Sequence, residues 1–412
     1  MLLIIQQLSS LVLTVLSAAQ IFVCPTTTAH ELTYYLDRYA KDTLQSVHAN
    51  FSLRLLSNSA HGELNAVLSP LSLAITLSLA SAAAGGVTRL QMNNVYAKGF
   101  STDTVQKYYS LLANKLSLKN NRTIIAPSVL VVLHLCDQSS VSNAMLHIAR
   151  DYLAGVHQFD CKNKSASLEY INQWIANQTN SQFEVITRNL HNVNWHFQLI
   201  DSFYLNAVWH YPFDEKRTTL KNFYVNEKTI TQVEMMSMWA FNKFKYTEDA
   251  DVQVLGLPYQ LDTNLYLYIF LPRKRFALRS VERELTGRRL LYLVARCKMV
   301  DVEVEIPRFA IENYFDLSIP LASLGIIEAF TSRADFPAIS VQKMRVSMIG
   351  QKTQFEINEK GSYPVNSSYG EISNNELRAL WQGGHIKFIA DHPFMFAVTQ
   401  CDQTILMGHY SS

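Results

Sequence analysis

Hydrophobic residues recur with helical spacing in the first part of the 412-residue chain. Between residues 31 and 57, leucines and tyrosines lie three to four positions apart, which predicts a helix with one apolar face. Ser69 and Pro70 then begin a run that reads as apolar throughout as far as Ala84. A capping serine followed by proline is a common helix start, and a helix that is apolar on all sides is a buried one. Residues 141–187 are also predicted to be mostly helical.

From about residue 199 onward the pattern changes to short segments that alternate or run apolar at strand length. These predicted strands are 199–209, 228–238, 251–259, 265–272, 300–311, 394–400 and 404–410. Because helices come first and strands later, we expect an α+β protein with a large, mainly antiparallel sheet rather than regular βαβ units.

Composition and charge exclude several classes of function. The chain is 48% hydrophobic and 17% charged, and 36 basic residues are interleaved with 34 acidic ones to give a net charge of +2. This balance argues against a protein that nucleic acid or a membrane surface recruits by charge. There is no nucleophile elbow, Walker loop or zinc-binding His-Glu motif, and His191 and His196 have no third ligand nearby. We therefore expect neither an enzyme nor a metal or cofactor site.

The first 24 residues carry no charged side chain and read as the apolar part of a signal peptide. Ser17 and Ala19 are the small residues expected before a cleavage site. The sequence thus predicts a signal peptide over 1–19, a short tail over 20–30 and one domain over 31–412, in a secreted, extracellular protein. The alternative is an uncleaved signal anchor, which the polar residues inside the run disfavour.

Five N-x-S/T sequons agree with passage through the secretory pathway, where such asparagines accept glycans. They lie at Asn50, Asn121, Asn163, Asn177 and Asn366. The five cysteines, by contrast, are too scattered to form a disulfide framework. One or two bridges would still be compatible with their number.

Residues 388–396 (FIADHPFMF), followed by ILMG at 405–408, resemble the carboxyl-terminal signature of the serpin family. Other motifs similar to the family's follow one another in the family's order. They are 65–72, 84–88, Tyr204, Trp209, Phe213, Thr218, 235–236, 257–259, 302–309, 324–326 and 334–336. The resemblance covers about 31–412.

The resemblance implies a fold of about nine helices and three sheets, in a monomer with an exposed reactive loop at about 359–387. In inhibitory serpins a protease cleaves this loop and forms an acyl-enzyme with it. The cut loop then enters the main sheet as a new central strand and deforms the protease. Insertion releases strain that the native fold stores.

Glu359, Lys360 and Gly361 match the family's hinge, at which the loop folds into the sheet. Inhibitory members continue with small residues, and here Ser362 conforms. If Ser362 points inward after insertion, alternation along a strand makes Pro364 and Asn366 point inward too. Proline has no N–H for the sheet and is essentially excluded from central strands. A glycan on Asn366 would prevent insertion outright.

Two positions remain candidates for the scissile bond. Spacing from Glu359 points to Asn375 and Glu376, whereas chemistry points to Arg378 and Ala379, because trypsin-like proteases require a basic residue.

The family also places a polar cluster beneath the point where the sheet opens. The matching residues here are Ser69, Ser72, Asp201 and Gln351, with Trp209 nearby. Family members have asparagine and histidine where this chain has Asp201 and Gln351. A buried carboxylate would have a raised pKa or need a further donor. We interpret the change as a compensated core pair rather than a pH switch.

A basic stretch near the middle of the chain resembles the patch through which some serpins bind glycosaminoglycans. It comprises Arg273, Lys274, Arg275, Arg279, Arg283, Arg288 and Arg289. Acidic residues interrupt it, so a solvated helix face is the preferred interpretation.

Two hypotheses of function remain. In the first, the chain is an extracellular serpin whose hinge makes trapping weak or absent, and it acts as a decoy or binds an unidentified ligand. In the second, it is a suicide inhibitor of a trypsin-like serine protease with Arg378 as bait.

Overall fold

The computed structural model describes residues 44–116, 123–135, 140–160, 164–178, 196–259, 263–340, 343–362, 386–400 and 403–411. The chain divides into two compact units, Met1–Gln45 and Ser46–Ser412. The first lies almost entirely outside the described residues, and so do the predicted signal peptide and tail. The elements below belong to the second unit, apart from the first two residues of its first helix.

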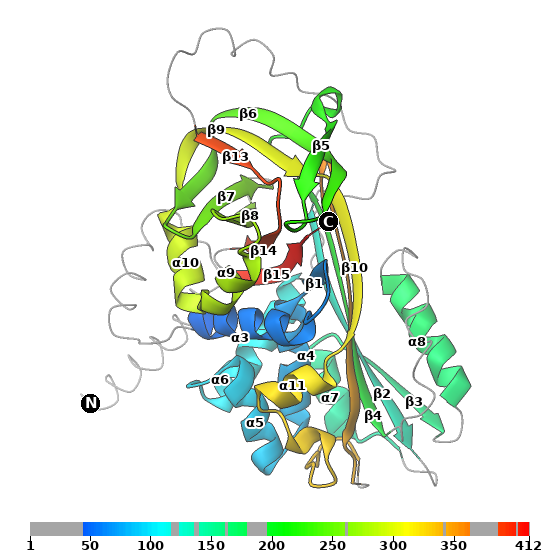
Figure 1. Cartoon of the computed structure of the whole chain (residues 1–412). Helices are drawn as coiled ribbons and strands as arrows, with labels where there is room; N and C mark the ends of the chain where they lie inside the picture. Colours follow the sequence, from blue (N-terminus) through cyan, green and yellow to red (C-terminus); the bar gives the residue numbers. More distant parts are fainter. Residues whose placement is uncertain are drawn as a thin grey trace, which may run out of the picture. The chain divides into compact units, whose positions relative to one another are not determined.

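One sheet has six strands, four of which are labelled in Figure 1, and the hinge joins it at the end of β4. Its order is β10 (Phe309–Asp316), β11 (Val346–Ile357), β4 (Phe197–Val208), β2 (Thr123–Leu135) and β3 (Gly155–Asp160). The short strand β12 (Gly361–Ser362) pairs with the end of β4. Strands β11 and β4 run parallel to each other, as do β2 and β3, whereas the other pairs are antiparallel.

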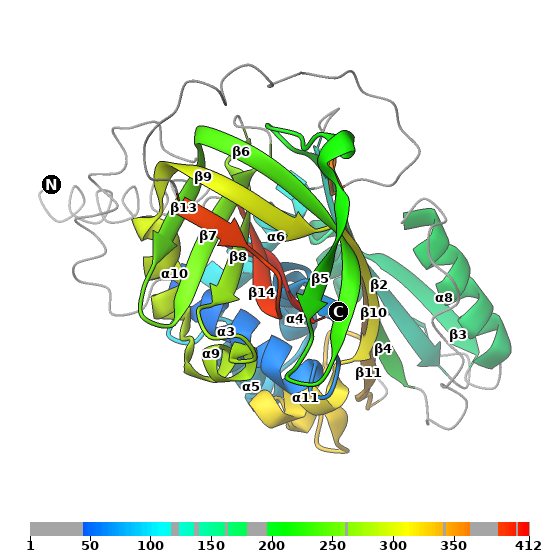
Figure 2. The ribbon, with the colours of Figure 1, turned by 45° about the horizontal axis from the view of Figure 1, so that its top comes forward.

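The second sheet has nine strands and includes the carboxyl-terminal signature. Its order is β1 (Ala66–Leu68), β15 (Gln403–Tyr410), β14 (Phe394–Gln400), β8 (Leu265–Pro272), β7 (Val252–Pro258), β6 (Ile230–Glu248), β9 (Lys298–Pro307) and β13 (Ile386–Ile389), with β5 (Thr219–Tyr224) also paired to β6. Figure 2 shows β6, β9 and β13 lying side by side.

The expected third sheet is continuous with this second one, because the 19-residue strand β6 belongs to both parts. Its first part pairs with β5 and with the end of β9. Its last four residues, Lys245–Glu248, pair with β7. The register with β9 shifts between Ala240 and Phe244, which marks the change from one part to the other.

Nine α-helices lie within the described residues, in agreement with the fold expected from the resemblance. They are α3 (Leu44–Ser59), α4 (Pro70–Ala83), α5 (Gly86–Tyr96), α6 (Thr102–Leu116), α7 (Asn143–Asp151), α8 (Lys164–Gln178), α9 (Leu278–Glu284), α10 (Gly287–Arg296) and α11 (Ser318–Leu324). Short 3₁₀ turns occur at η1 (Glu215–Arg217) and η3 (Glu328–Phe330). None of the helices in this part of the chain is both long and apolar enough to cross a membrane.

Helix α4 is the buried helix that the sequence predicts, and it positions part of the candidate site. Ser69 caps its start by accepting a hydrogen bond from the Ser72 N–H, and Pro70 occupies the first turn. All but one of its 14 residues are buried. It contacts β2 and β4 of one sheet and β15 of the other, so polar groups at its start can reach both sheets.

Strands β2 and β3 lie before residue 199, in a region where the hydrophobic pattern predicts no strand. The prediction of a mostly helical segment over 141–187 is wrong at β3, which separates α7 from α8. The apolar run 129–133 in β2 is buried without interruption, so it shows no two-residue alternation. Pairing between the strands, rather than local periodicity, determines their conformation.

Candidate functional site

The hinge doubles back at the end of β11 and enters the six-stranded sheet. The Asn358 N–H donates to the Gly361 carbonyl at 2.9 Å, which closes a tight turn between β11 and β12. Gly361 and Ser362 then pair antiparallel with Val208 and Ala207 of β4. The first two residues of the loop strand are therefore already paired with the end of β4, on the side of β4 where β11 lies.

Gly361 is required by space as well as by conformation. Its φ is +144°, a conformation that residues with a side chain rarely adopt. A Cβ atom at this position would lie 2.2 Å from the Ala207 carbonyl oxygen and 2.9 Å from the Val208 Cα. No other residue would let the hinge approach β4 so closely.

Ser362 points into the protein and contacts an aromatic pair. Only 1% of its surface is exposed, and its hydroxyl lies 2.5 Å from the Tyr259 hydroxyl. The Tyr259 ring stacks on Trp209 with 4.4 Å between ring centroids. Burial raises the pKa of Tyr259, so its hydroxyl stays protonated and available for this hydrogen bond. The inward direction on which the sequence argument depends therefore holds at Ser362.

Glu359 and Lys360 anchor the turn to the segment that follows β4. The Thr218 hydroxyl donates to the Glu359 carboxylate at 2.6 Å, and the Glu359 carbonyl accepts from the Phe213 N–H at 2.9 Å. The Lys360 carbonyl accepts from the Trp209 N–H at 2.8 Å. Because both main-chain and side-chain groups take part, the hinge has a fixed position before any loop insertion.

A second polar cluster surrounds Asp201 on β4, which is fully buried. One carboxylate oxygen accepts from the Ser72 hydroxyl, and the other accepts from the Gln351 amide nitrogen at 2.6 Å. The same amide group bonds the backbone of Ser69 twice, at 2.9 Å each. The Ser69 hydroxyl donates to the Ile405 carbonyl at 2.8 Å. The cluster thus joins α4 and β15 to the parallel pair β4 and β11.

No neighbouring cation compensates the Asp201 carboxylate within these described elements. Helix α4 has no charged residue, and Lys352 of β11 projects to the opposite face, where it pairs with Glu312. Burial raises the pKa of Asp201 from its ordinary value of 3.8 to about 7, although hydrogen bonds from Ser72 and Gln351 act in the opposite direction. Of the two consequences expected for a carboxylate at this position, the raised pKa occurs, whereas the donors are Ser72 and Gln351 of the cluster itself.

Trp209 does not belong to this second cluster, and the grouping made from the sequence is corrected here. It lies eight residues beyond Asp201 along the chain, roughly 26 Å at the rise of an extended strand. Its indole N–H donates to the Asn358 carbonyl at 2.9 Å. Trp209 therefore supports the hinge, whereas Ser69, Ser72, Asp201 and Gln351 form a separate cluster further along the sheet.

Tyr259 and Thr218 are hinge partners that the sequence analysis does not assign to the site. Tyr259 is 103 residues from Ser362 and Thr218 is 141 residues from Glu359. Both residues lie within segments that resemble the family's motifs, and this resemblance was the sign in the sequence that they could belong to the site. Which hinge residue each one contacts follows only from the folded chain.

Several predicted site residues lie outside the described residues. These are Pro364, Asn366, Asn375, Glu376, Arg378 and Ala379 of the loop, together with the sequons at Asn121 and Asn163. Asn177 is exposed on α8. The Asn50 amide nitrogen, the atom to which a glycan would attach, donates to the Ser46 carbonyl at 3.0 Å, and its oxygen accepts from the Gly287 N–H at 2.8 Å. A glycan on Asn50 would disrupt this contact between α3 and α10.

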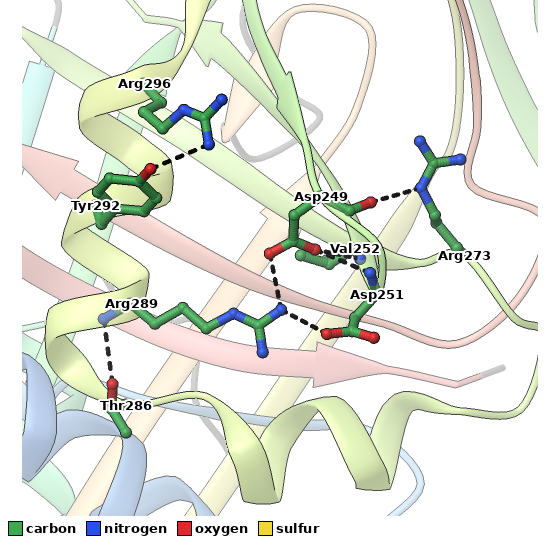
Figure 3. Close-up of polar contacts among 8 residues, drawn as sticks. All are labelled: Asp249, Asp251, Val252, Arg273, Thr286, Arg289, Tyr292 and Arg296. Atoms are coloured by element: carbon green, nitrogen blue, oxygen red, sulfur yellow. Dashed lines mark hydrogen bonds and ion pairs between the residues drawn. The ribbon is translucent and has the colours of Figure 1, made fainter.

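Three of the seven members of the basic stretch pair with nearby carboxylates, and Figure 3 shows the pairs that Arg289 makes. Arg289 bonds Asp249 at 2.7 Å and Asp251 at 2.8 Å. The Arg273 side chain pairs with Glu248 at 2.7 Å and also donates to the Asp249 carbonyl. Arg275 pairs with Asp391 at 2.6 Å. The remaining members, Lys274, Arg279, Arg283 and Arg288, are exposed on or beside α9 and α10. The structure therefore weakens the case for a glycosaminoglycan patch.

The part of the chain that the structure describes contains neither a candidate metal site nor a cysteine with an activated thiol. No group of three or more His, Cys, Asp or Glu residues there has the geometry to hold a metal ion. Cys297 is a free, half-buried cysteine, and burial raises the pKa of its thiol to about 12, so the thiol stays protonated.

Comparisons with known proteins agree with this architecture. The model of the family Serpin (serine protease inhibitor) matches residues 46–412. Serine protease inhibitor 42Dd of Drosophila melanogaster is 26% identical over 92% of this chain and 100% of its own length. Intracellular coagulation inhibitor 2 of Tachypleus tridentatus is 28% identical over 93% of this chain and 95% of its own length. Human thyroxine-binding globulin, solved as a complex with thyroxine, shares the fold with a TM-score of 0.79 and 21% identity, over 90% of this chain and 98% of that one.

The chain belongs to the serpin family. Members of this family are mostly inhibitors of serine proteases rather than catalysts, and some bind ligands instead. Both kinds occur among the proteins to which this chain is similar.

Proposed function

We propose that this chain is an extracellular serpin that presents residues 359–387 to proteases but traps them weakly or not at all, and acts as a decoy or a binding protein. The observation that carries the proposal is the position of Ser362. It lies buried beside β4, so any further insertion must continue from a fixed register.

That register makes Pro364 the critical residue. Gly361 lies opposite Val208 and Ser362 opposite Ala207, so a continuing strand would place Pro364 opposite Leu205. The turn at 358–361 would bring β11 to its other side. Proline would then lie between two strands, where its missing N–H leaves a carbonyl without a partner.

Another proline in the same sheet occupies a position at which a missing N–H is tolerated. Pro127 lies in β2 opposite Phe203 of β4. Pairing of β2 with β3 begins only at Leu130, so at Pro127 the strand has β4 on one side and no β3 on the other. Pro364 would have no such unpaired side.

Asn366 adds a second obstacle. Alternation from Ser362 makes Asn366 point inward as well, so insertion would bury its amide. A buried amide needs hydrogen-bond partners, and a glycosylated one could not enter. The two obstacles act on the same stretch of the loop.

The second candidate is a working suicide inhibitor of a trypsin-like protease that cleaves after Arg378. The favouring observation is the intact hinge, since Gly361 and Ser362 are already seated in the sheet. A related protein is named as a serine protease inhibitor. For this candidate, a bulge at Pro364 would have to accommodate the missing donor.

Incubation with trypsin, followed by denaturing electrophoresis, separates the two candidates. We expect cleavage of the loop without an SDS-stable covalent complex, and only a small rise in thermal stability after cleavage. The matched variant Pro364→Ala should form more complex than the wild type. Arg378→Ala should lose cleavage at that bond. A stable complex with the wild-type chain would contradict the decoy proposal and favour the inhibitor.

Secretion is part of the same proposal and rests on the uncharged first 24 residues and the sequons. Expression of the full chain in an animal cell line should release it into the medium, beginning near residue 20 by amino-terminal sequencing. Treatment with an N-glycosidase should lower its apparent mass. Retention in cells with an intact amino terminus would contradict this part of the proposal.

A further inference from the structure

The Asp201 carboxylate lies between the two strands that would have to part to admit a further strand. It is directly opposite Gln351 of β11, within the parallel pairing of β4 and β11. The Gln351 amide nitrogen donates to it at 2.6 Å, so this hydrogen bond crosses the line along which the strands would separate. The short strand β12 is already paired with the end of β4. Asp201 is thus a fully buried charge site on the path of insertion.

Within the described strands and helices that pack against this carboxylate, no cation faces it. Helix α4 and strand β1 carry no charged residue, and β4 carries none besides Asp201. The charged or titratable residues of the other strands lie an odd number of positions from Gln351 or from its neighbours in register, so they project from the opposite face, on which α8 packs. These residues are His134 of β2, Lys352 and Glu356 of β11, and Glu312 and Asp316 of β10.

Two buried titratable groups contact the elements around the cluster, and neither becomes charged between pH 5 and 8. His48 of α3 donates through Nε2 to a carbonyl of β15 at 2.9 Å, and burial lowers its pKa to about 4. Tyr152 bonds Ser78 further along α4, and burial raises its pKa. His409 lies at the far end of β15, where it bonds Glu282. The carboxyl on β4 is therefore the group of this cluster that changes charge near neutral pH.

Both protonation states of Asp201 can keep the two hydrogen bonds of the closed cluster. The charged carboxylate accepts from the Ser72 hydroxyl and from the Gln351 amide. The protonated carboxyl can donate to the Ser72 hydroxyl, which takes either role, and still accept from Gln351. The two states differ in charge, and only the charged one pays the cost of burial without a cation.

Separation of β4 from β11 would change the proton affinity of this carboxyl. In the closed sheet burial raises its pKa to about 7, whereas water between parted strands would return it toward 3.8. Opening therefore releases a proton between these two pH values, and each pH unit in that range favours the open form by up to about tenfold. Above pH 7 the carboxyl is charged in both forms, so the dependence levels off.

We propose that the proton on Asp201 acts as a latch between β4 and β11, which holds the two strands together when bound and favours their separation when released. Acidic conditions keep the sheet closed to an inserting strand, and neutral or alkaline conditions free it. The lack of a compensating cation is why the structure favours this latch over the compensated core pair that the sequence suggested. The latch belongs to the sheet itself, so it does not rest on whether the chain traps proteases.

Hydrogen–deuterium exchange of the intact, uncleaved chain tests the latch. Peptic peptides that cover 199–203 and 349–353 report on the β4–β11 pair, and peptides that cover 265–270 of β8 are the internal reference. After correction for the intrinsic exchange rate, protection of the β4–β11 amides should fall up to about tenfold per pH unit from pH 5 to 7 and then level off.

Low concentrations of urea separate local opening from global unfolding. Opening of one strand pair exposes little surface, so exchange of the β4–β11 amides should be nearly insensitive to urea, whereas exchange at β8 should accelerate. Equal protection and equal urea dependence in the two regions at every pH would overturn the proposal, because the strands would then separate only when the whole domain unfolds.

Three variants assign the effect to the carboxyl. In Asp201→Asn, protection of the β4–β11 amides should not change between pH 5 and 7. Ser72→Ala removes a donor that lowers the pKa of Asp201, so the fall in protection should extend to higher pH before it levels off. Asp103→Asn, which changes an exposed aspartate of α6, should keep the wild-type profile. A wild-type profile in either Asp201→Asn or Ser72→Ala would overturn the proposal.

These measurements use no protease, so they are independent of the trypsin experiment. A stable trypsin complex would contradict the decoy proposal and leave the exchange profiles as expected. A flat profile in the wild type would remove the latch and leave the outcome with trypsin unaffected.

Discussion

Replacing Asp201 by asparagine tests the electrostatics of the buried cluster. The carboxyl has a pKa of about 7 in the folded chain and an ordinary value of 3.8, because burial disfavours the charged form. Well below pH 3.8 the group is protonated in both the folded and unfolded states, so its burial then carries no charge penalty. As the pH rises from 4 to 7, the unfolded state releases its proton first, so folding stability falls.

The difference between these two pKa values corresponds to about 4 kcal/mol of folding free energy at pH 8, as an upper bound. The asparagine side chain of the variant would remain neutral at every pH. It could accept from Gln351 and donate to the Ser72 hydroxyl, which can act in either role. We therefore expect Asp201→Asn to unfold at higher urea concentration than the wild type at pH 8 and at a similar concentration near pH 4.

The assay is urea unfolding followed by circular dichroism at pH values from 4 to 8. The control is Asp103→Asn, which changes an exposed aspartate in the first turn of α6. The wild type and the control should lose stability as the pH rises, whereas Asp201→Asn should lose less. Parallel pH profiles for the wild type and Asp201→Asn would refute the argument, because the carboxylate would then carry no burial penalty.

Three further predictions concern the hinge and the basic stretch. Gly361→Ala should displace β12, since its Cβ would overlap the Ala207 carbonyl, and proteases should then cleave near residue 360 faster; an unchanged cleavage rate would contradict this. Tyr259→Phe should lose about 1 kcal/mol by removing the hydrogen bond to Ser362 while the stacking on Trp209 remains, and faster amide exchange at Ser362 would report it. On a heparin column the chain should elute below about 0.15 M salt, because carboxylates neutralise three of the seven basic residues; retention beyond that salt would restore the glycosaminoglycan hypothesis.

The sequence predicted the family and the buried helix α4, since both depend on local signals. Ser69 and Pro70 form a recognisable helix start, and the motif at 388–396 has a fixed order of residues. Strands β2 and β3 were not predicted, because the apolar run in β2 has no alternation and β3 depends on β2 as its partner.

The sequence named some residues of the candidate site but not its hinge partners Tyr259 and Thr218, and it did not give the grouping. The resemblance pairs Asp201 with Gln351, and in the structure the Gln351 amide donates a hydrogen bond to the Asp201 carboxylate. Trp209 was grouped with them, although its position at the end of β4 brings it to the hinge. The contact of Ser362 with Tyr259 could not be predicted, because no local pattern links residues 103 positions apart.

The seated strand β12 has a kinetic consequence. Starting a new strand requires closing a turn, which is entropically the costly first step, and here the turn at Asn358–Gly361 is already closed. The rate of any later insertion would then depend on how readily β4 and β11 separate along their parallel pairing, which extends from Val346–Phe197 to Thr353–Phe203. The hydrogen bond between Asp201 and Gln351 lies within that stretch. The activation barrier to loop insertion, rather than the closing of the first turn, would therefore depend on the charge of Asp201.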